Sequence, residues 1–366
     1  MMSFPHSVTY FLLCSISVIY TPLSLAHDAQ HPLAITSSLS MDEQAARLSQ
    51  FFDKEVIVSG PKVVDCTLSG GAKTQCLQIE VQSVTDHEQG PWCPNTVNEG
   101  IQKGGMMFYD GEVYGIDGGF IKNLAQFFND DQWQLFNPKT GVVNVTRTKK
   151  ACAAAAKPDV EDEYRNYCVQ CQVSYMGNAL TTTYIIPIKP VIDKGLQRAN
   201  EFTGYGVAFN GVKFDVRAPI EHILGAYTLA PFDACGGHVN LHVGYHYHAA
   251  MGCSTQWRSV ATHAPIIGLA VDGHLIYSRL NADGQEPDDL DSCRGHRFAN
   301  LGYHYHVNLP AKNQILGCLK GQQGCALDQK MMKNKQGGML CDASQRPLRP
   351  LRPPKERPPK ERPPKE

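Results

Sequence analysis

The pentapeptide Gly244-Tyr245-His246-Tyr247-His248 is repeated as Gly302-Tyr303-His304-Tyr305-His306. Each copy follows the pattern Asp-x-Cys-x-Gly-His, which begins at Asp233 in the first half and at Asp291 in the second. The offset between the halves stays at 58 residues over the whole pattern. Chance rarely repeats so many scarce residue types in register. We therefore take the duplicated histidine module as the functional centre of the protein.

Each half also contains a predicted β-hairpin ahead of its cysteine. Residues 206–214 and 268–276 are apolar on both sides of an Asn-Gly or Asp-Gly pair, a strong hairpin signal. These hairpins are 62 residues apart, because the connection from hairpin to cysteine is four residues shorter in the second half. We expect a mainly β fold with a few short helices, whose duplicated halves pack about a pseudo-twofold axis beside a smaller α+β N-terminal region.

The repeated histidines have the spacing of metal ligands on a strand. Side chains at i and i+2 point to the same side, so His246 and His248 share one face and the tyrosines take the other. His304 and His306 do the same in the second half and, if the halves pack symmetrically, approach the same region. Four neutral imidazoles suit Zn or Cu better than Ca or Mg. The alternative is a structural repeat whose histidines hydrogen-bond within a polar core.

Two more histidines, His238 and His296, occupy equivalent positions after Cys-x-Gly in each half. Each could be a metal ligand in its own half, or could contact a metal ligand without binding the metal itself. Asp233 and Asp291 could orient a ligand imidazole or cap the turn before each cysteine, and both interpretations stay open. For the remaining histidines of this region the repeat provides no partner, and a surface or core position is favoured over a ligand role: His222, His242, His263 and His274.

Thirteen cysteines become twelve if Cys14 is removed with a signal peptide, and an even number fits a disulfide framework in an oxidising compartment. Cys66 and Cys76 flank the turn at residues 69–71, so a hairpin there would set them opposite each other and allow a cross-strand disulfide.

The cysteines that bracket the two Tyr-His strands predict two further disulfides, Cys235–Cys253 and Cys293–Cys318. Cys168 and Cys171 form a Cys-x-x-Cys motif, but no thioredoxin-like pattern surrounds it. Pairing of these two with others, such as Cys93 and Cys152, is therefore favoured over a redox role.

The two ends of the chain are typical of export and of a solvated tail. Residues 8–25 are largely apolar, and Ser24-Leu25-Ala26 offers a signal peptidase site, with an uncleaved anchor as the alternative. We expect a secreted, periplasmic or extracellular protein with no membrane segment after cleavage. The basic Pro-rich tail favours a solvated spacer over contact with an extracellular glycan or cell surface. A net charge of −1 gives no electrostatic case for nucleic acid.

The expected organisation has six parts. They are a signal peptide (1–26), a polar lead with a short helix (27–60), an α+β disulfide-containing region (61–165), a connector (166–199), the duplicated metal-binding domain (200–330) and the basic tail (331–366).

These residues resemble the YHYH-domain family of exported proteins. The resemblance covers residues 200–320 and rests on Asn210-Gly211, Asp272-Gly273, both Asp-x-Cys-x-Gly-His patterns and both Gly-Tyr-His-Tyr-His copies. Residues 90–156 resemble a region that accompanies such domains in some members. Membership implies export and metal binding, and it implies no reaction.

Two functions fit these observations. One is a metalloenzyme that acts on extracellular material through a Zn or Cu ion with an open coordination position. The other is a non-catalytic metal-binding or surface-interaction module in which a metal holds the fold together. An enzyme needs an unsatisfied coordination position beside a cleft, whereas a structural site is closed by four protein ligands.

Overall fold

Strands make up most of the regular structure, so the prediction of a mainly β fold is confirmed. The computed structural model describes residues 39–157, 160–176, 180–241, 243–258 and 260–328, which belong to one unit of the chain. The predicted signal peptide, the Pro-rich tail and His242 lie outside these residues. Among the described helices, none is long and apolar enough to cross a membrane.

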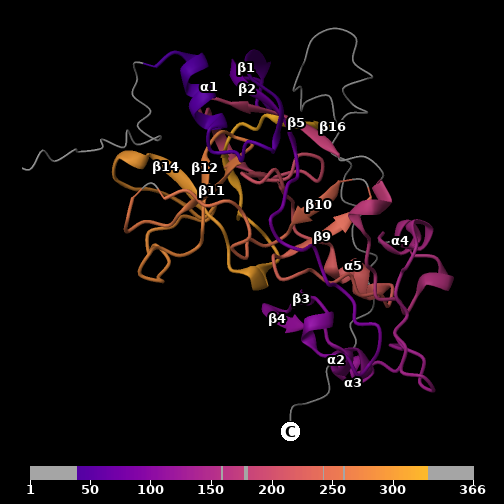
Figure 1. Ribbon diagram of the computed structural model, residues 1–366. Coiled ribbons are helices and arrows are strands. Elements are labelled where there is room, and N and C mark those ends of the chain that lie inside the picture. The colour runs from indigo at the N-terminus through magenta and orange to yellow at the C-terminus, as the bar shows by residue number, and fades with distance from the viewer. Residues whose placement is uncertain (1–38, 158–159, 177–179, 242, 259, 329–366) are drawn as a thin grey trace, which may run out of the picture. The chain divides into compact units, whose positions relative to one another are not determined.

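The elements follow one another along the chain as labelled in Figure 1. The α-helices are α1 (Met41–Ser49), α2 (Gly118–Lys122), α3 (Leu124–Phe127), α4 (Lys149–Ala155) and α5 (Ile220–Gly225). Single 3-10 turns are η1 (Ile101–Lys103), η2 (Asp162–Tyr164), η3 (Val173–Met176), η4 (Ala299–Leu301) and η5 (Pro310–Lys312). The strands of the N-terminal part are β1 (Ile57–Thr67), β2 (Lys73–Gln82), β3 (Met106–Tyr109), β4 (Glu112–Gly115), β5 (Thr181–Pro187) and β6 (Ile192–Gln197). Those of the duplicated part and beyond are β7 (Gly206–Ala208), β8 (Lys213–Phe214), β9 (Gly237–Asn240), β10 (Gly244–Tyr247), β11 (Ile266–Ala270), β12 (Leu275–Tyr277), β13 (Gly295–Arg297), β14 (Tyr303–His306), β15 (Leu319–Gly321) and β16 (Cys325–Asp328).

The duplicated halves form one eight-stranded sheet in the order β13-β14-β12-β11-β7-β8-β10-β9. This order is symmetric about its centre, because each strand of the first half has its counterpart at the same distance from the middle. The central strands β7 and β11 are antiparallel, with Val207 opposite Leu269. These two residues are themselves 62 positions apart, the repeat offset of the hairpins. A pseudo-twofold axis therefore passes through this pair, as the repeat predicts.

The turn of each duplicated hairpin requires glycine. Gly211 has φ +78° and Gly273 has φ +89°, in the left-handed region that favours glycine. A Cβ at Gly211 would overlap the carbonyl oxygen of Gln82, and one at Gly273 would overlap that of Pro187. Both turns thus press against the backbone of the neighbouring β1-β2-β5 region, and the absent side chain permits this approach.

The tyrosines of both Tyr-His strands point away from the histidines, as strand geometry predicts. Tyr245 donates a hydrogen bond to Asp233 at 2.7 Å, and Tyr303 donates one to Asp291 at 3.0 Å. The other oxygen of Asp233 accepts from the backbone N–H groups of Cys235 and Gly237. Asp291 makes the same two backbone contacts in its own half. The structure therefore resolves the open alternative, because both aspartates cap the cysteine turn and neither contacts an imidazole.

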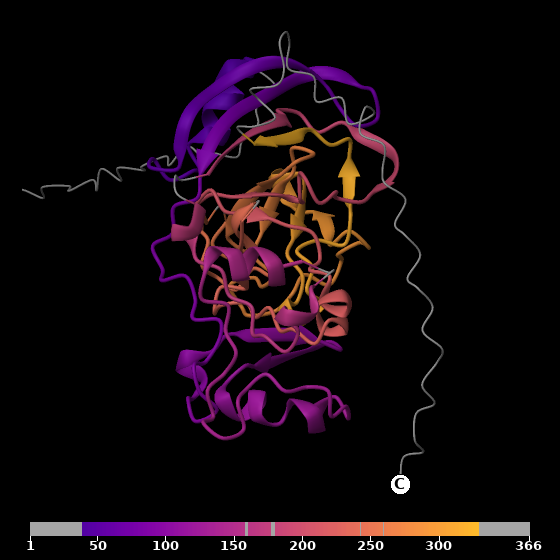
Figure 2. The ribbon, with the colours of Figure 1, turned by 90° about the vertical axis from the view of Figure 1, so that its right-hand side faces the viewer.

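A second, four-stranded sheet has the order β1-β2-β5-β16 (Figure 2). The disulfide Cys66–Cys76 joins β1 and β2 as predicted. Its cysteines do not face each other, however, because Cys66 pairs with Thr74 and Cys76 pairs with Val64. The expected register is wrong because the turn is centred on Gly70, which places the two cysteines diagonally across the ladder at a Cα–Cα distance of 6.0 Å.

The two disulfides predicted beside the Tyr-His strands, Cys235–Cys253 and Cys293–Cys318, are also present. Cys168 bonds to Cys93 and Cys171 bonds to Cys152, in the region that contains α4. The Cys-x-x-Cys motif thus consists of two cysteines bonded elsewhere, and the interpretation against a redox role agrees with this pairing. Residues 142–146 contribute only isolated bridges.

Candidate metal centres

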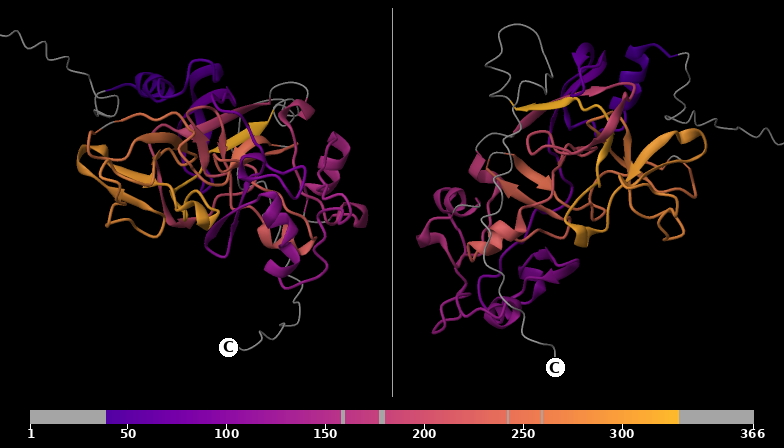
Figure 3. Two further views of the ribbon diagram at one scale, coloured as in Figure 1. Left: turned by 60° about the horizontal axis from the view of Figure 1, so that its bottom comes forward. Right: turned by 180° about the vertical axis from the view of Figure 1, so that it is seen from behind.

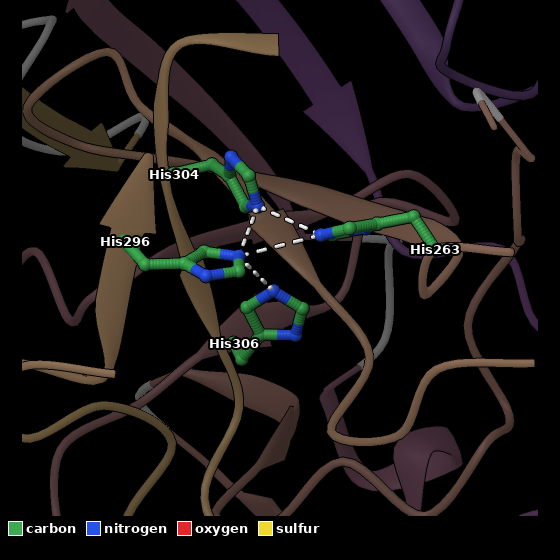
Figure 4. Close-up of side chains that lie close together, drawn as sticks. All are labelled: His263, His296, His304 and His306. Carbon is green, nitrogen blue, oxygen red and sulfur yellow. Dashed lines mark hydrogen bonds between the residues drawn. The ribbon is translucent and has the colours of Figure 1, made fainter. Parts of the chain in front are cut away.

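Four histidines of the second half converge on one point, and we call them the second-half cluster: His263, His296, His304 and His306. His296 lies on β13, His304 and His306 lie on β14, and His263 precedes β11. Figure 4 shows their rings pointing toward one another. All four side chains are buried. The alternation of β14 places His304 and His306 on one face, and the pairing of His296 opposite His304 adds the third ring.

The outer nitrogen of each ring is hydrogen-bonded to an oxygen that can only accept. The Nδ1 of His304 contacts the carbonyl of Gly302 at 3.0 Å, and that of His306 contacts the carbonyl of Ser278 at 2.8 Å. The Nδ1 of His296 contacts the carboxylate of Asp289. Since these oxygens accept, each Nδ1 carries a ring proton, and Nε2 is the nitrogen that faces the centre.

The Nδ1 of His263 also contacts a backbone carbonyl, that of Ala264, at a longer distance of 3.3 Å. Its Nε2 lies 3.3 Å from the Nε2 of both His296 and His304. The Nε2 of His296 lies 3.1 Å from that of His304 and 3.2 Å from that of His306. Four lone pairs therefore face one another at close range, an arrangement that repels unless a cation lies between them.

These separations match a tetrahedral metal site. With a metal–nitrogen bond of about 2.0–2.1 Å, the nitrogens of a regular tetrahedron are about 3.3–3.4 Å apart. Four of the six Nε2–Nε2 separations are 3.1–3.3 Å, just inside that value, and all four ligand atoms lie within 4.8 Å of one another. The four imidazoles could therefore hold one metal ion, each oriented through its other nitrogen.

Burial disfavours the protonated forms of His304 and His306. Burial, followed by the neighbouring rings, lowers the pKa of His304 to about 2. Burial also lowers the pKa of His306 to about 3, although the carbonyl of Ser278 works against this shift. Both rings are therefore neutral ligands rather than imidazolium ions.

The first half gathers three histidines, which we call the first-half cluster: His238, His246 and His248. His238 lies on β9 opposite His246 on β10, and His248 follows β10 directly. Their ligand atoms all lie within 4.8 Å of one another. The Nδ1 of His246 contacts the carbonyl of Gly244 at 2.9 Å, and that of His248 contacts the carbonyl of Val216 at 2.6 Å. These contacts repeat those of His304 and His306, so Nε2 is again the free nitrogen.

Burial first, and then the neighbouring histidines, lower the pKa of each ring of the first-half cluster to about 3. The rings are thus neutral at physiological pH and able to bind a metal.

An acidic side chain stands beside the first-half cluster. One oxygen of Asp215 lies 3.9 Å from the Nε2 of His246, and the other lies 3.0 Å from the Nζ of Lys213. Burial alone would raise the pKa of Asp215, but the ammonium of Lys213 and the nearby rings hold it below its usual value. At the hairpin offset, the position equivalent to Asp215 in the second half is Tyr277, which packs over the ring of His304 with centroids 4.2 Å apart.

The two clusters also differ in their number of histidines and in their access. At the same offset, the first-half position equivalent to His263 is the exposed residue Glu201, so the first-half cluster has no fourth imidazole. A cleft of about 860 Å³ reaches His238, His246 and His248, and Asp215 forms part of its wall. The first-half cluster is therefore an open arrangement beside a cleft, whereas the second-half cluster is closed.

The halves do not bring their histidines to one region, and this expectation is wrong. The Tyr-His strands β10 and β14 are separated by β8, β7, β11 and β12. At a strand spacing of about 4.8 Å, five steps place them roughly 24 Å apart along the sheet. Figure 3 shows the orange strands of the second half and the salmon pair of β9 and β10 at different ends. The reason is the position of the axis, which runs through β7 and β11 while the histidines lie on the outer strands.

Six of the seven clustered histidines are among the ligands predicted from the sequence, whereas His263 and the neighbouring Asp215 are not. His263 was expected at the surface or in the core, yet it is buried within the second-half cluster. Asp215 follows directly after the predicted hairpin, and the signal for it was a buried-strand pattern interrupted by Lys213 and Asp215 at i and i+2. No local pattern marks His263, because the repeat has glutamate at that position.

His87 also lies near two sulfur atoms, those of Cys235 and Cys253. These sulfurs are bonded to each other, so they offer no thiolate to a metal. His222 is exposed and His274 contacts the carbonyl of Tyr303, which places both outside the clusters.

Comparison with known proteins gives one match. No curated protein and no solved structure matches the chain. The family model described as YHYH protein covers residues 183–289, which include the whole first-half cluster and His263 but end before His296. Residues 183–289 of this chain are thus similar to the YHYH family.

Proposed function

We propose that this is an exported metalloprotein with two transition-metal sites, Zn or Cu, of different kinds. In the second half, four imidazoles close a structural site that ties β13, β14 and the segment before β11 together. In the first half, His238, His246 and His248 hold a metal with an open position, and the protein acts as a metalloenzyme on extracellular material. The disulfide framework supports the extracellular setting.

The observation that carries the enzymatic assignment is the contrast between the two clusters. Three protein ligands with an accessible fourth position are the pattern of catalytic zinc sites, and four protein ligands are the pattern of structural ones. The first-half cluster has three imidazoles, a cleft and an adjacent carboxylate, whereas the second-half cluster has four imidazoles and a tyrosine in place of that carboxylate.

The residues around the open position have distinct tasks. A bound Zn or Cu ion supplies a Lewis acid to the group that occupies this position. The carbonyls of Gly244 and Val216 fix the rings of His246 and His248 with Nε2 toward the ion. Asp215 lies beside the open position, where it can accept a hydrogen bond from a water molecule, and Lys213 holds that carboxylate in place.

Metal analysis of three proteins tests the two sites. We expect two equivalents of metal in the wild-type chain, one in the variant His246→Ala/His248→Ala and one in the variant His304→Ala/His306→Ala. Each double variant is the control for the other, because the same residue types are removed from the same strand positions of the opposite half. If the wild-type protein, prepared without chelators, contains as little metal as the two double variants, the proposal is overturned.

Cobalt substitution tests which site is open. Azide binds to a metal only where a coordination position is accessible, so it should change the visible spectrum of Co(II) in the variant that keeps the first-half cluster. The variant that keeps the second-half cluster should not respond. An absent response in both would leave two structural sites and support a non-catalytic metal-binding module instead.

A further inference from the structure

The cleft beside the first-half cluster has a predominantly apolar wall. Its lining includes Val169, Val216, Ala218, Ile223 and Val239, in addition to Trp92. A volume of about 860 Å³ falls within the range of sites that take small organic molecules, and such sites typically combine apolar walls with a few polar groups at one end. Its polar groups include the first-half cluster and Asp215, together with Gln170, Thr181, Thr182 and Asn240.

The basic side chains that line this cleft each have an acidic partner. Lys213 pairs with Asp215 at 3.0 Å. Arg217 pairs with Glu221 at 2.7 Å, and Lys157 pairs with Glu161 at 3.4 Å. Glu201 also borders the cleft, but it is exposed, and water and salt screen its charge.

Three neutral imidazoles leave the charge of a divalent ion uncompensated. A single anionic group at the open position would reduce that charge and would also accept the coordination bond. The apolar wall next to it would bury hydrocarbon, and a purely inorganic anion would leave this wall exposed to water.

We propose that the cleft binds an amphiphilic monocarboxylate. Its carboxylate occupies the open position of the first-half cluster, and its hydrocarbon chain lies along the wall that includes Ile223 and Val239. This inference rests on the proposed function, because it needs a metal with an open position. It adds the chemical class of the substrate or product.

A chain-length series tests the inference. Straight-chain carboxylates from acetate to octanoate are titrated calorimetrically into the zinc-loaded His304→Ala/His306→Ala variant, with octanamide as the neutral analogue. Burial of each methylene should tighten binding about fourfold until the wall is covered. Octanamide should bind at least about tenfold more weakly than octanoate, because it offers no negative charge to the metal site.

Matched variants assign the effect to the cleft wall. Ile223 is half-buried on α5, and Ile223→Gln should flatten the chain-length dependence while the affinity for acetate stays unchanged. Ile192→Gln makes the same substitution on β6, at a side chain that is 57% exposed and does not line the cleft. It should change neither the chain-length dependence nor the affinity for acetate.

The outcomes separate this inference from the proposed function. If metal is present and azide binds, but affinity does not depend on chain length, the open site stands and the amphiphilic ligand is refuted. Equal binding of octanamide and octanoate would likewise refute the anionic head. If metal is absent from the first-half cluster, the proposed function fails before any carboxylate is added.

Discussion

Replacement of His263 by alanine tests whether the second-half cluster is a metal site or a set of packed core histidines. Loss of a group that merely orients a metal ligand lowers metal affinity about 10- to 100-fold, and loss of the ligand itself should cost at least as much. That range corresponds to about 1.4–2.7 kcal/mol. For a fold of about 280 residues, the entropy of unfolding near 60 °C is about 0.6 kcal/mol per kelvin. We therefore expect the Tm of the metal-loaded protein to fall by at least about 2–5 °C through the metal alone.

The cavity left by the missing imidazole adds its own cost, and the experiment must separate the two. Wild type and His263→Ala are compared by calorimetry with metal bound and again after removal of metal by a chelator. The cavity affects both states, so the difference between the two comparisons isolates the metal contribution. In the metal-free state, the variant also loses one of the four ring nitrogens that face one another. This loss should raise the stability of metal-free His263→Ala relative to metal-free wild type.

His222→Ala provides the matched control, because His222 is exposed on α5 and lies outside both clusters. It should have the same Tm as wild type under both conditions. An equal loss of stability by His263→Ala with and without metal would refute the metal site, since a packed core histidine predicts that result.

Three further predictions concern the scaffold. Asp233→Asn should destabilise the fold by about 1–3 kcal/mol in urea unfolding, because this buried carboxylate accepts from three backbone N–H groups and from Tyr245, while exposed Asp131→Asn should be neutral. The double variant Cys66→Ser/Cys76→Ser opens a loop with a separation of 10 residues and should lose about 2.7 kcal/mol in the same assay; an unchanged midpoint would show that the bridge does not constrain the unfolded chain. Gly273→Ala should destabilise more than Gly284→Ala, because both positions have φ near +80° to +89° but only at Gly273 would the new Cβ meet backbone; equal losses would assign the whole effect to φ.

Much of the duplicated fold could be predicted because its signals are local. The Asn-Gly and Asp-Gly turns each fix a hairpin, and strand alternation assigns His246 and His248 to one face and the tyrosines to the other. The disulfides beside the Tyr-His strands followed from cysteines that bracket each strand. These features depend on residues close together in the chain.

Features set by long-range packing were not predictable in the same way. The repeat implied two similar halves, but it did not say which strands would meet at the axis. That β7 and β11 meet there sends the histidines to separate ends of the sheet. His263 joins its cluster through a loop that has no equivalent histidine in the first half. A comparison of the two repeats therefore could not identify it. The diagonal Cys66–Cys76 bridge shows the same limit at small scale, since a shift in the turn centre changes the pairing.

The location of the axis has a consequence for how such a chain can arise. A single half would leave β7 without the strand that it pairs with. Two identical halves could supply that pairing to each other, in the antiparallel register that joins Val207 and Leu269. In such a symmetric dimer any mutation changes both sites at once. Fusion of the halves into one polypeptide removes that constraint, so one copy can keep a closed cage with Tyr277 while the other acquires Asp215 and an entrance. The covalent link between the halves thus lets their two histidine clusters differ.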